Sequence, residues 1–441
     1  MFLTRERGLW FRSILYLLLL TLFFFSSYGL ANWFTSQRSD VGIVVFSWEK
    51  IIPLWSWTII PYWSIDIFYG LAILLAPSVF QLNILVKRLF SAQVICITCF
   101  LIWPLMFSFE RPELDGYSGM LFDLLMGFDK PFNQAPSLHI TLLVILWVFY
   151  AKYLHGIWQW LLHIWFSLIA ISVLTTWQHH FFDVPTGLLV GAFCIWLWPA
   201  QGASLFYQAR YPKQWCWGSI YLIFTAILLT ITLMVGANAV WLLWLALALT
   251  ITALNYYFVG ARGFQKQENG RFTIIGRFLL LPYQLIMWGN SRLWTRCDDE
   301  FNLVFNKVYL GRIPSRSTLK KHRFSTVVDL CAELPMPTYY ENYILVPVLD
   351  MAAPSLDECR KGVEAINTGL AHGDVLVCCA LGYSRSATII LAWLLSNRIA
   401  ESLDDAIQIL KKARPNSVIN AKQVIILNQW IRLLNGENYR H

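Results

Sequence analysis

Long apolar runs dominate residues 1–259, and their lengths predict membrane-spanning helices. A helix that crosses a bilayer needs about 20 mostly apolar residues. Eight segments come close to this requirement, namely residues 9–30, 52–77, 90–109, 138–155, 157–175, 184–200, 217–234 and 239–259. Arg5, Arg7 and Arg12 accompany the start of the first segment, which lacks a small-residue cleavage site, so we expect a retained anchor rather than a signal peptide.

The pattern changes near residue 305, where short β-rich runs alternate with helical periodicity. The expected strands are 308–310, 326–330, 343–348 and 375–378, and the expected helices are 355–371, 386–400 and 403–413. Such alternation is typical of an α/β domain with a mainly parallel sheet. We therefore predict a multi-domain protein, with a polytopic α-helical membrane bundle at 1–259, a linker at 260–304 and an α/β domain at 305–441.

The linker contains one further apolar segment, residues 272–288. Arg277 and Pro282 interrupt it, and the clean stretch is shorter than the roughly 20 residues of a span. We interpret it as an amphipathic helix at the membrane surface. The alternative is a ninth span, which would move the C-terminal domain to the other side of the membrane.

Composition supports a membrane protein, because 57% of the 441 residues are hydrophobic and only 14% are charged. The net charge of +8 is not gathered into a basic stripe, so we expect membrane lipids and not nucleic acid as partners. If the N-terminus is cytoplasmic, the loops on that side hold more basic residues than the opposite loops. These residues are Arg5, Arg7, Arg12, Lys87, Arg88, Lys152, Arg210 and Lys213. An even number of spans then places both termini in the cytoplasm, as in a multi-pass protein of a bacterial inner (plasma) membrane.

Three polar clusters interrupt the apolar part on the same predicted membrane face. They are Glu110-Arg111-Pro112, Pro136-Ser137-Leu138-His139 and His179-His180-Phe181-Phe182-Asp183. Such residues can be interfacial anchors. They also suit phosphoryl transfer, because a His oriented by a carboxylate can attack phosphorus and a second His can protonate the leaving oxygen. His179 and Asp183 are one helical turn apart, whereas His180 points elsewhere and is expected to form a structural hydrogen bond.

These clusters resemble the signature of the type-2 phosphatidic acid phosphatase superfamily, K-x(6)-R-P, P-S-G-H and S-R-x(5)-H-x(3)-D. The resemblance implies that His179 is the nucleophile, Asp183 its orienting partner and His139 the general acid. Arg111, Ser137 and Lys130 would bind the phosphate.

The departures from this signature are Pro104 for Lys, Leu138 for Gly and Val173 for Arg. They resemble the branch that includes inositol phosphorylceramide and sphingomyelin synthases. Lipid phosphate hydrolysis, head-group transfer and a non-catalytic lipid-binding anchor therefore all remain open for this part.

The strongest motif lies in the C-terminal part, where the run 375–386 reads VLVCCALGYSRS and leads into an apolar helix. A loop between a strand and a helix directs backbone N–H groups and the positive end of the helix dipole at its centre. Such a loop binds an oxyanion and favours a thiolate, for which Cys379 is placed. Arg385, six positions on, offers a planar pair of donors for phosphate oxygens.

This C-x(5)-R loop resembles that of the protein tyrosine phosphatase superfamily, and residues 305–435 resemble a dual-specificity phosphatase. Val308–Arg312 is similar to the opening strand, and Arg414-Pro415 to a late helix-end motif. The resemblance implies that Cys379 attacks phosphorus, Arg385 and Ser384 bind the phosphate, and Gly382 permits the loop bend. Ser386 would stabilise the leaving thiolate, and Asp350 would be the general acid.

Two positions leave alternatives within that resemblance. Asp357 is a rival general acid, although its place after Ser355 suits the first turn of a helix. Cys378 replaces the His that is usual before the nucleophile. The whole pattern predicts a bifunctional membrane phosphatase that acts on phosphorylated lipid or protein, with no metal or cofactor.

Overall fold

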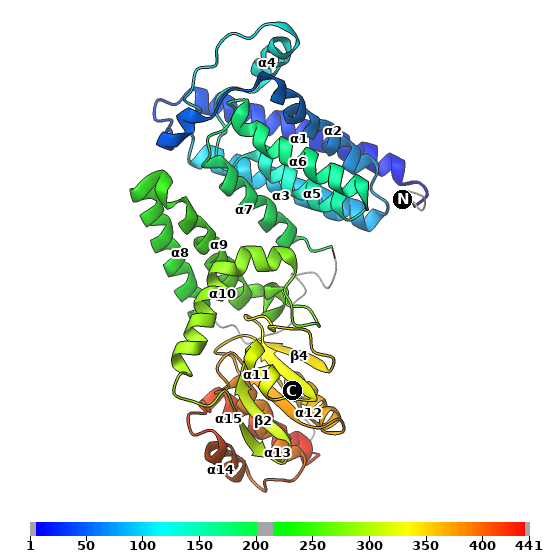
Figure 1. Cartoon of the computed structure of the whole chain (residues 1–441), viewed down its shortest axis with the longest axis vertical. Helices are drawn as coiled ribbons and strands as arrows, with labels where there is room; N and C mark the ends of the chain where they lie inside the picture. The colour runs from blue at the N-terminus through cyan, green and yellow to red at the C-terminus, as the bar shows by residue number, and fades with distance from the viewer. Residues whose placement is uncertain (1–5, 201–214, 437–441) are drawn as a thin grey trace. The chain divides into compact units, whose positions relative to one another are not determined.

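The computed structural model describes residues 6–200 and 215–436, which form two compact units. The first unit comprises residues 6–200 and 225–247, and the second comprises 215–224 and 248–436. Arg5, Arg210 and Lys213, which contribute to the expected charge asymmetry, lie outside the described residues. Figure 1 shows helices throughout the N-terminal part and a sheet in the C-terminal part.

Each of the eight expected spans corresponds to a helix among the described residues, with shifted ends. These are α1 (Leu9–Ser36), α2 (Ile59–Leu74), α3 (Val79–Ile102), α5 (Leu138–Ala151), α6 (Ile157–Thr175), α7 (Asp183–Leu197), α8 (Trp215–Val235) and α9 (Val240–Leu254). A further helix, α4 (Gly116–Phe128), was not expected from the sequence.

The third helix corrects the prediction most. Helix α3 begins near residue 79 rather than 90, because the Ser78 side chain accepts a hydrogen bond from the Gln81 N–H at 3.2 Å. It ends before Pro104, which cannot continue a helix. Lys87 and Arg88 therefore lie within a helix. The charge argument had placed both of them in a loop, which is wrong. Arg88 is buried and donates to the Trp198 carbonyl at 2.9 and 2.7 Å.

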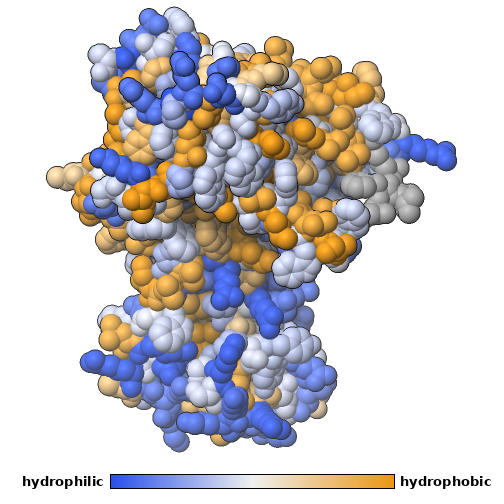
Figure 2. Space-filling model, turned by 45° about the horizontal axis from the view of Figure 1, so that its top comes forward, coloured by the Kyte–Doolittle hydropathy of each residue, from blue (hydrophilic) through white to orange (hydrophobic). Residues whose placement is uncertain are grey.

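Five helical stretches of the described chain are long and apolar enough to cross a membrane: 9–36, 56–74, 79–102, 157–175 and 215–259. Helices α5 and α7 are apolar but shorter than the roughly 20 residues that a span requires. Large apolar side chains of α1 are exposed, including those of Trp10, Phe11, Leu18 and Leu22. Figure 2 shows more apolar residues on the helical part and more hydrophilic ones on the sheet domain, as expected where one part faces lipid and the other water.

The packing of α5 against α7 brings two of the polar clusters together. A Cβ atom on Gly187 of α7 would lie 2.6 Å from the Ser137 carbonyl oxygen, so only glycine permits this approach. The Thr141 hydroxyl of α5 donates to the Gly187 carbonyl at 3.1 Å, and the Ser137 N–H donates to the Asp183 carbonyl at 3.1 Å. The start of α5, which holds His139, is thereby joined to the loop before α7, which holds His179.

The second unit contains the expected α/β domain. Its strands are β1 (Phe301–Phe305), β2 (Val308–Arg312), β3 (Thr326–Cys331), β4 (Tyr343–Val348) and β5 (Val375–Cys379). Their order in the sheet is β1-β2-β5-β3-β4. The pairing of β1 with β2 is antiparallel and the other pairings are parallel, so the sheet is mixed.

Helices α12 (Leu356–Leu370), α13 (Arg385–Ser396) and α14 (Leu403–Ala413) match the helical predictions and pack against the sheet. The buried core lies between these helices and the central strands. Strand β1 and helices α11 (Arg316–Lys321) and α15 (Ala421–Leu434) were not predicted.

The segment before the sheet is built into the second unit. It contains a π-helical turn at Asn255–Val259, a 3-10 turn at Ala261–Phe264 and helix α10 (Ile274–Trp294). The Lys266 ammonium is buried and donates to the Asp329 carboxylate, the Cys331 carbonyl and the Leu334 carbonyl, each at 2.7 Å. This one side chain ties residues 260–273 to the end of β3.

Candidate active sites

The loop between β5 and α13, residues 379–385, is named here the anion loop. The sulfur of Cys379, at the end of β5, accepts hydrogen bonds from the Gly382 N–H and the Ser386 hydroxyl, each at 3.2 Å. The Cys379 side chain is 3% exposed. Two donors are therefore aimed at the atom that would carry negative charge in a nucleophilic attack.

The anion loop needs glycine at its bend. Gly382 has φ +76, and a Cβ atom there would lie 2.5 Å from the backbone of Gly311 in β2. The neighbouring Ser384 precedes α13, and its hydroxyl oxygen accepts a hydrogen bond from the Gln423 side chain. Helix α15 thus holds the Ser384 side chain through Gln423.

Two other side chains hold the carbonyl groups of the anion loop. Arg414 is buried and donates to the Leu381 carbonyl at 3.2 Å, which gives the Arg414-Pro415 element a supporting position. Ser291 of α10 donates to the Ala380 carbonyl at 2.5 Å. Carbonyl groups that are held outward leave the loop N–H groups free to point at its centre.

Arg385 lies at the start of α13 and is held by two carboxylates. Its guanidinium donates to both Glu333 carboxylate oxygens, at 2.9 and 2.6 Å, and to the Val348 carbonyl at 2.9 Å. The Asp350 carboxylate lies 3.0 Å from the same guanidinium. The structure therefore places the thiol, the guanidinium and the expected general acid around one loop.

The two carboxylates differ in the directions of their pKa shifts. Burial raises the pKa of Asp350, and the Glu333 charge adds to this, while Arg385 opposes it. Burial would also raise the pKa of Glu333, but its bonds to Arg385 outweigh burial and hold that pKa below its usual value. Asp350 is thus the carboxyl that keeps a proton more readily, as a general acid must.

Sequence reasoning missed Glu333. It follows the buried strand β3, at the carboxyl end of a parallel strand next to β5. Ligand-binding residues of α/β sheets gather at this edge, so an acidic residue three positions after the predicted strand 326–330 was a usable signal.

The two alternatives noted in the sequence take structural positions away from the loop centre. Asp357 is exposed in the first turn of α12, where it pairs with Arg360 and Lys361. Cys378 is fully buried, and burial together with the nearby Asp329 charge raises the pKa of its thiol. Because successive strand residues face opposite sides of a sheet, Cys378 does not share the donors of Cys379.

A thiol at the end of a central parallel strand, with a guanidinium and a carboxyl group beside it, is the set of groups expected of a cysteine-based phosphatase. The comparisons with known proteins agree. Residues 308–432 match the family model "Dual specificity phosphatase, catalytic domain". These residues therefore form a catalytic domain of the phosphoric monoester hydrolase class.

Among curated proteins, the chain is similar to a probable dual specificity protein phosphatase of Dictyostelium discoideum, with 32% identity over 148 residues. That match covers 32% of this chain and 37% of the Dictyostelium protein. Dual specificity protein phosphatase 1 of Arabidopsis thaliana is 31% identical over 136 residues, which are 29% of this chain and 66% of that protein. The chain thus spans only part of these relatives.

Among solved structures, human DUSP28 is 26% identical, with a TM-score of 0.29, covering 31% of this chain and 96% of that chain. Tk-PTP in its active form is 25% identical, with a TM-score of 0.28, covering 31% of this chain and 98% of that chain. The family model does not extend to residues before 308, so the resemblance of the helical part to type-2 phosphatidic acid phosphatases stays a prediction.

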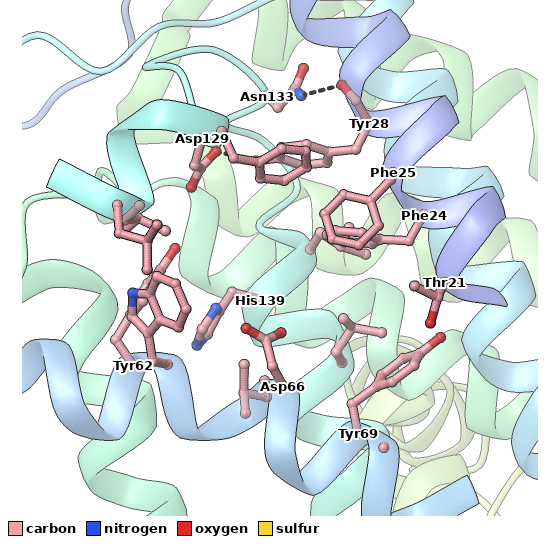
Figure 3. A pocket seen from close by; sticks show the side chains of 18 of the residues that line it. Thr21, Phe24, Phe25, Tyr28, Tyr62, Asp66, Tyr69, Asp129, Asn133 and His139 are labelled. Carbon is pink, nitrogen blue, oxygen red and sulfur yellow. Dashed lines mark hydrogen bonds between the residues drawn. The ribbon is translucent and has the colours of Figure 1, made fainter. Parts of the chain in front are cut away.

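The helical unit contains a cavity of about 500 Å³ between α1, α2, α4 and α5, and both His139 and His179 line it. Figure 3 shows His139 facing this space beside Asp66 and Tyr62. The His139 ring stacks on Tyr62 with centroids 4.1 Å apart. His179 Nδ1 lies 3.2 Å from the carboxylate of Asp183, which is 1% exposed. The pair expected from the H-x-x-x-D spacing is therefore formed.

The other expected phosphate ligands of the helical unit do not line this cavity. Arg111 donates to the carbonyls of Thr176 and Trp177, at 3.2 and 3.0 Å. Ser137 is buried and caps α5 by accepting from the Ile140 N–H. Lys130 is exposed.

A second buried pair, between His180 and Glu49, was not predicted. His180 Nδ1 lies 2.8 Å from the Glu49 carboxylate, and its Nε2 accepts from the Ser108 N–H at 3.2 Å. His180 therefore has the structural hydrogen bonds expected of it. Within residues 6–200 and 215–436, no group of three or more His, Cys, Asp or Glu side chains could hold a metal ion.

Proposed function

We propose that this protein is a membrane-bound phosphatase whose C-terminal domain hydrolyses phosphate monoesters. The observation that carries the proposal is the position of Cys379, whose sulfur accepts two hydrogen bonds inside a loop flanked by Arg385 and Asp350. This arrangement can bind a phosphate dianion and supply both a nucleophile and an acid.

The residues suggest a two-step reaction. The Cys379 thiolate attacks phosphorus and an S–P bond forms while the P–O bond to the leaving group breaks. Asp350 gives its proton to the departing oxygen, and Arg385 holds the phosphoryl oxygens as charge shifts. A water molecule then attacks phosphorus and gives its proton to Asp350, and the S–P bond breaks. The thiolate returns, stabilised by the Ser386 hydroxyl, and inorganic phosphate leaves.

Helix α10 supports a substrate presented at the bilayer. Its apolar side chains Ile274, Leu285, Ile286, Trp288, Leu293 and Trp294 are exposed. The last turn of α10 contacts the anion loop, because Tyr383 donates to the Trp294 carbonyl at 3.2 Å and Ser291 donates to Ala380. We infer that α10 lies at the membrane surface, on the cytoplasmic face of a bacterial inner membrane, and that the substrate is a lipid phosphate rather than a phosphoprotein.

A Cys379→Ser variant tests this function. The serine hydroxyl is a much weaker nucleophile than a thiolate. We therefore expect hydrolysis of an aryl phosphate by the purified full-length protein to fall by about 10³-fold or more. Cys297→Ser changes an exposed cysteine and should retain the wild-type rate. Undiminished turnover by Cys379→Ser would refute the assignment.

A second function is proposed for the helical unit, because one cavity contains both histidines and Asp183 orients His179. His179 would attack a phospholipid at phosphorus, and His139 would protonate the leaving oxygen. Three outcomes remain possible for this unit: hydrolysis of lipid phosphate esters, transfer of a head group between lipids, or lipid binding without chemistry.

His179→Ala, made in the Cys379→Ser background, distinguishes these outcomes. The reaction is measured with phospholipid labelled on phosphorus, in detergent. Loss of turnover by about 10³-fold supports chemistry at His179. Label in inorganic phosphate indicates hydrolysis, and label in a new lipid indicates transfer. His155→Ala, which changes an exposed histidine, is the control, and equal activity of His179→Ala and its parent would leave only the anchor role.

A further inference from the structure

The cavity beside the histidines has an acidic polar end. Asp66 of α2 and Asp129 after α4 both line it, together with Tyr28, Tyr62 and Asn133. Figure 3 shows the Asp66 carboxylate pointing into the space beside His139. Asp129 lies across this space from Asp66. The Tyr28 hydroxyl donates to Asp129 at 2.6 Å.

Two further polar atoms of the cavity lining lack partners. Asn133 is 2% exposed, and its side-chain oxygen forms no hydrogen bond with the described residues. The Nε2 atom of His139 is also buried without a partner there. Because a buried polar atom without a partner is costly, these atoms indicate that a ligand supplies polar contacts at this end.

The charges at this end select the kind of ligand. Among the described residues that line the cavity, none is Lys or Arg, and Arg111 is engaged by the carbonyls of residues 176 and 177. Two carboxylates without a cation repel a phosphate dianion and accept hydrogen bonds from hydroxyl or ammonium groups. The remaining walls are largely apolar, with Phe24, Phe25 and Leu142 among them, which suits lipid chains.

We propose that this cavity is a binding site for a lipid whose head group donates hydrogen bonds and carries no net negative charge. Asp66 and Asp129 hold the hydroxyl or ammonium group, and the apolar walls take the first part of the chains. Asp66 and Asp129 share this cavity with His139 and His179.

The test is photo-crosslinking of the full-length protein in nanodiscs with three photoactivatable probes: diacylglycerol, phosphatidylethanolamine and phosphatidic acid. We expect the first two probes to label peptides of α1 and α2 about tenfold more than phosphatidic acid does. A ratio of about this size is expected from the free energy of one hydrogen bond to a charged group. Preference for diacylglycerol identifies a hydroxyl ligand, and preference for phosphatidylethanolamine an ammonium ligand. Equal or stronger labelling by phosphatidic acid overturns the proposal.

Variants connect the labelling to the carboxylates. Asp66→Asn and Asp129→Asn should lower the favoured labelling by about tenfold, and Asp66→Glu should restore it by keeping the charge. Asp123→Asn, on the exposed side of α4, should leave it unchanged. If neither Asn variant changes the labelling while both elute as folded protein, the proposal is wrong.

His179→Ala separates this lipid site from the chemistry proposed for the helical unit. We expect labelling to persist in this variant, because His179 is not one of the acceptors. If His179→Ala retains phospholipid turnover while the labelling follows the carboxylates, the lipid site stands and the proposed reaction fails. If labelling ignores the carboxylates while turnover depends on His179, the reaction stands and the lipid site fails.

Discussion

At the scale of residues, the proposed chemistry of the anion loop depends on how two carboxylates share the Arg385 guanidinium. Glu333 binds Arg385 through both oxygens, while Asp350 approaches at 3.0 Å and remains 21% exposed on its side chain. This difference lets Glu333 orient Arg385 and leaves Asp350 able to exchange a proton. A phosphate dianion that enters the loop would compete with Asp350 for the same donors.

The raised pKa of Asp350 predicts a pH dependence. The acid form is needed to protonate the leaving oxygen, so activity on poor leaving groups should fall as pH rises through the raised pKa of Asp350. Asp350→Asn should remove this alkaline limb and slow alkyl phosphates by about 10²-fold, with a smaller effect on aryl phosphates. Profiles of kcat/KM against pH for both substrates provide the measurement, and an unchanged alkaline limb in the variant would contradict the assignment.

The same shift affects stability. Folding favours protonated Asp350, so its contribution to stability is complete below the ordinary pKa of an aspartate. That contribution is lost as pH rises through the raised pKa. Asp350 therefore stabilises the fold least at the alkaline end of this range.

At the scale of elements, the turn segment before α10 is held by one ion pair. Lys266 is 1% exposed on its side chain and Asp329 is 0% exposed, and the two lie 2.7 Å apart. Lys266 also donates to the carbonyl of Cys331, the last residue of β3, and to that of Leu334 beyond the strand. The ion pair thus links residues 260–273 to β3, the strand that precedes Glu333.

Replacing Lys266 by Met keeps the volume and removes the charge. Asp329 is then buried without a cation and keeps only the hydrogen bonds from the Tyr343 hydroxyl and the Cys331 N–H. We expect a loss of about 3–5 kcal/mol in the free energy of unfolding of the second unit. Thermal unfolding of the detergent-solubilised protein measures this loss. Lys307→Met changes an exposed lysine and should leave the unfolding temperature nearly unchanged. Equal effects of the two substitutions would show that the ion pair is not important for stability.

At the scale of the whole molecule, the protein joins a helical unit rich in apolar surface to a hydrophilic catalytic unit. The proposed orientation places the catalytic unit in the cytoplasm. It depends on the number of spans, because a span formed by α10 would reverse the side of the C-terminal domain. The side on which the catalytic unit lies is therefore a test of the whole arrangement.

Cysteine labelling determines that side. Cys216 and Cys297 are the exposed free cysteines among the described residues, so a Cys216→Ser protein retains Cys297 as the exposed thiol. We expect a membrane-impermeant maleimide to label Cys297 in inverted inner-membrane vesicles and to leave it unlabelled in intact spheroplasts. The Cys216→Ser, Cys297→Ser protein gives the background. Labelling in spheroplasts would place the catalytic unit outside and contradict the proposed topology.

The sequence by itself determined what depends on local pattern. The apolar runs located eight helices, although two of them are shorter than expected, and the order of strand, C-x(5)-R loop and helix located Cys379 and Arg385. The one-turn spacing of His179 and Asp183 located their pair. The ends of α3 were less well predicted, because the cap at Ser78 and the stop before Pro104 outweighed hydropathy.

Only the tertiary structure decided which distant residues meet. Glu333 reaches Arg385, Lys266 reaches Asp329 and Glu49 reaches His180 across long sequence separations. The close approach of α5 and α7 brings His139 and His179 to one cavity, and α2 and α4 add Asp66 and Asp129 to it. The physical reason is that burial and charge pairing depend on neighbours in space, which the spacing of residues along a chain does not specify.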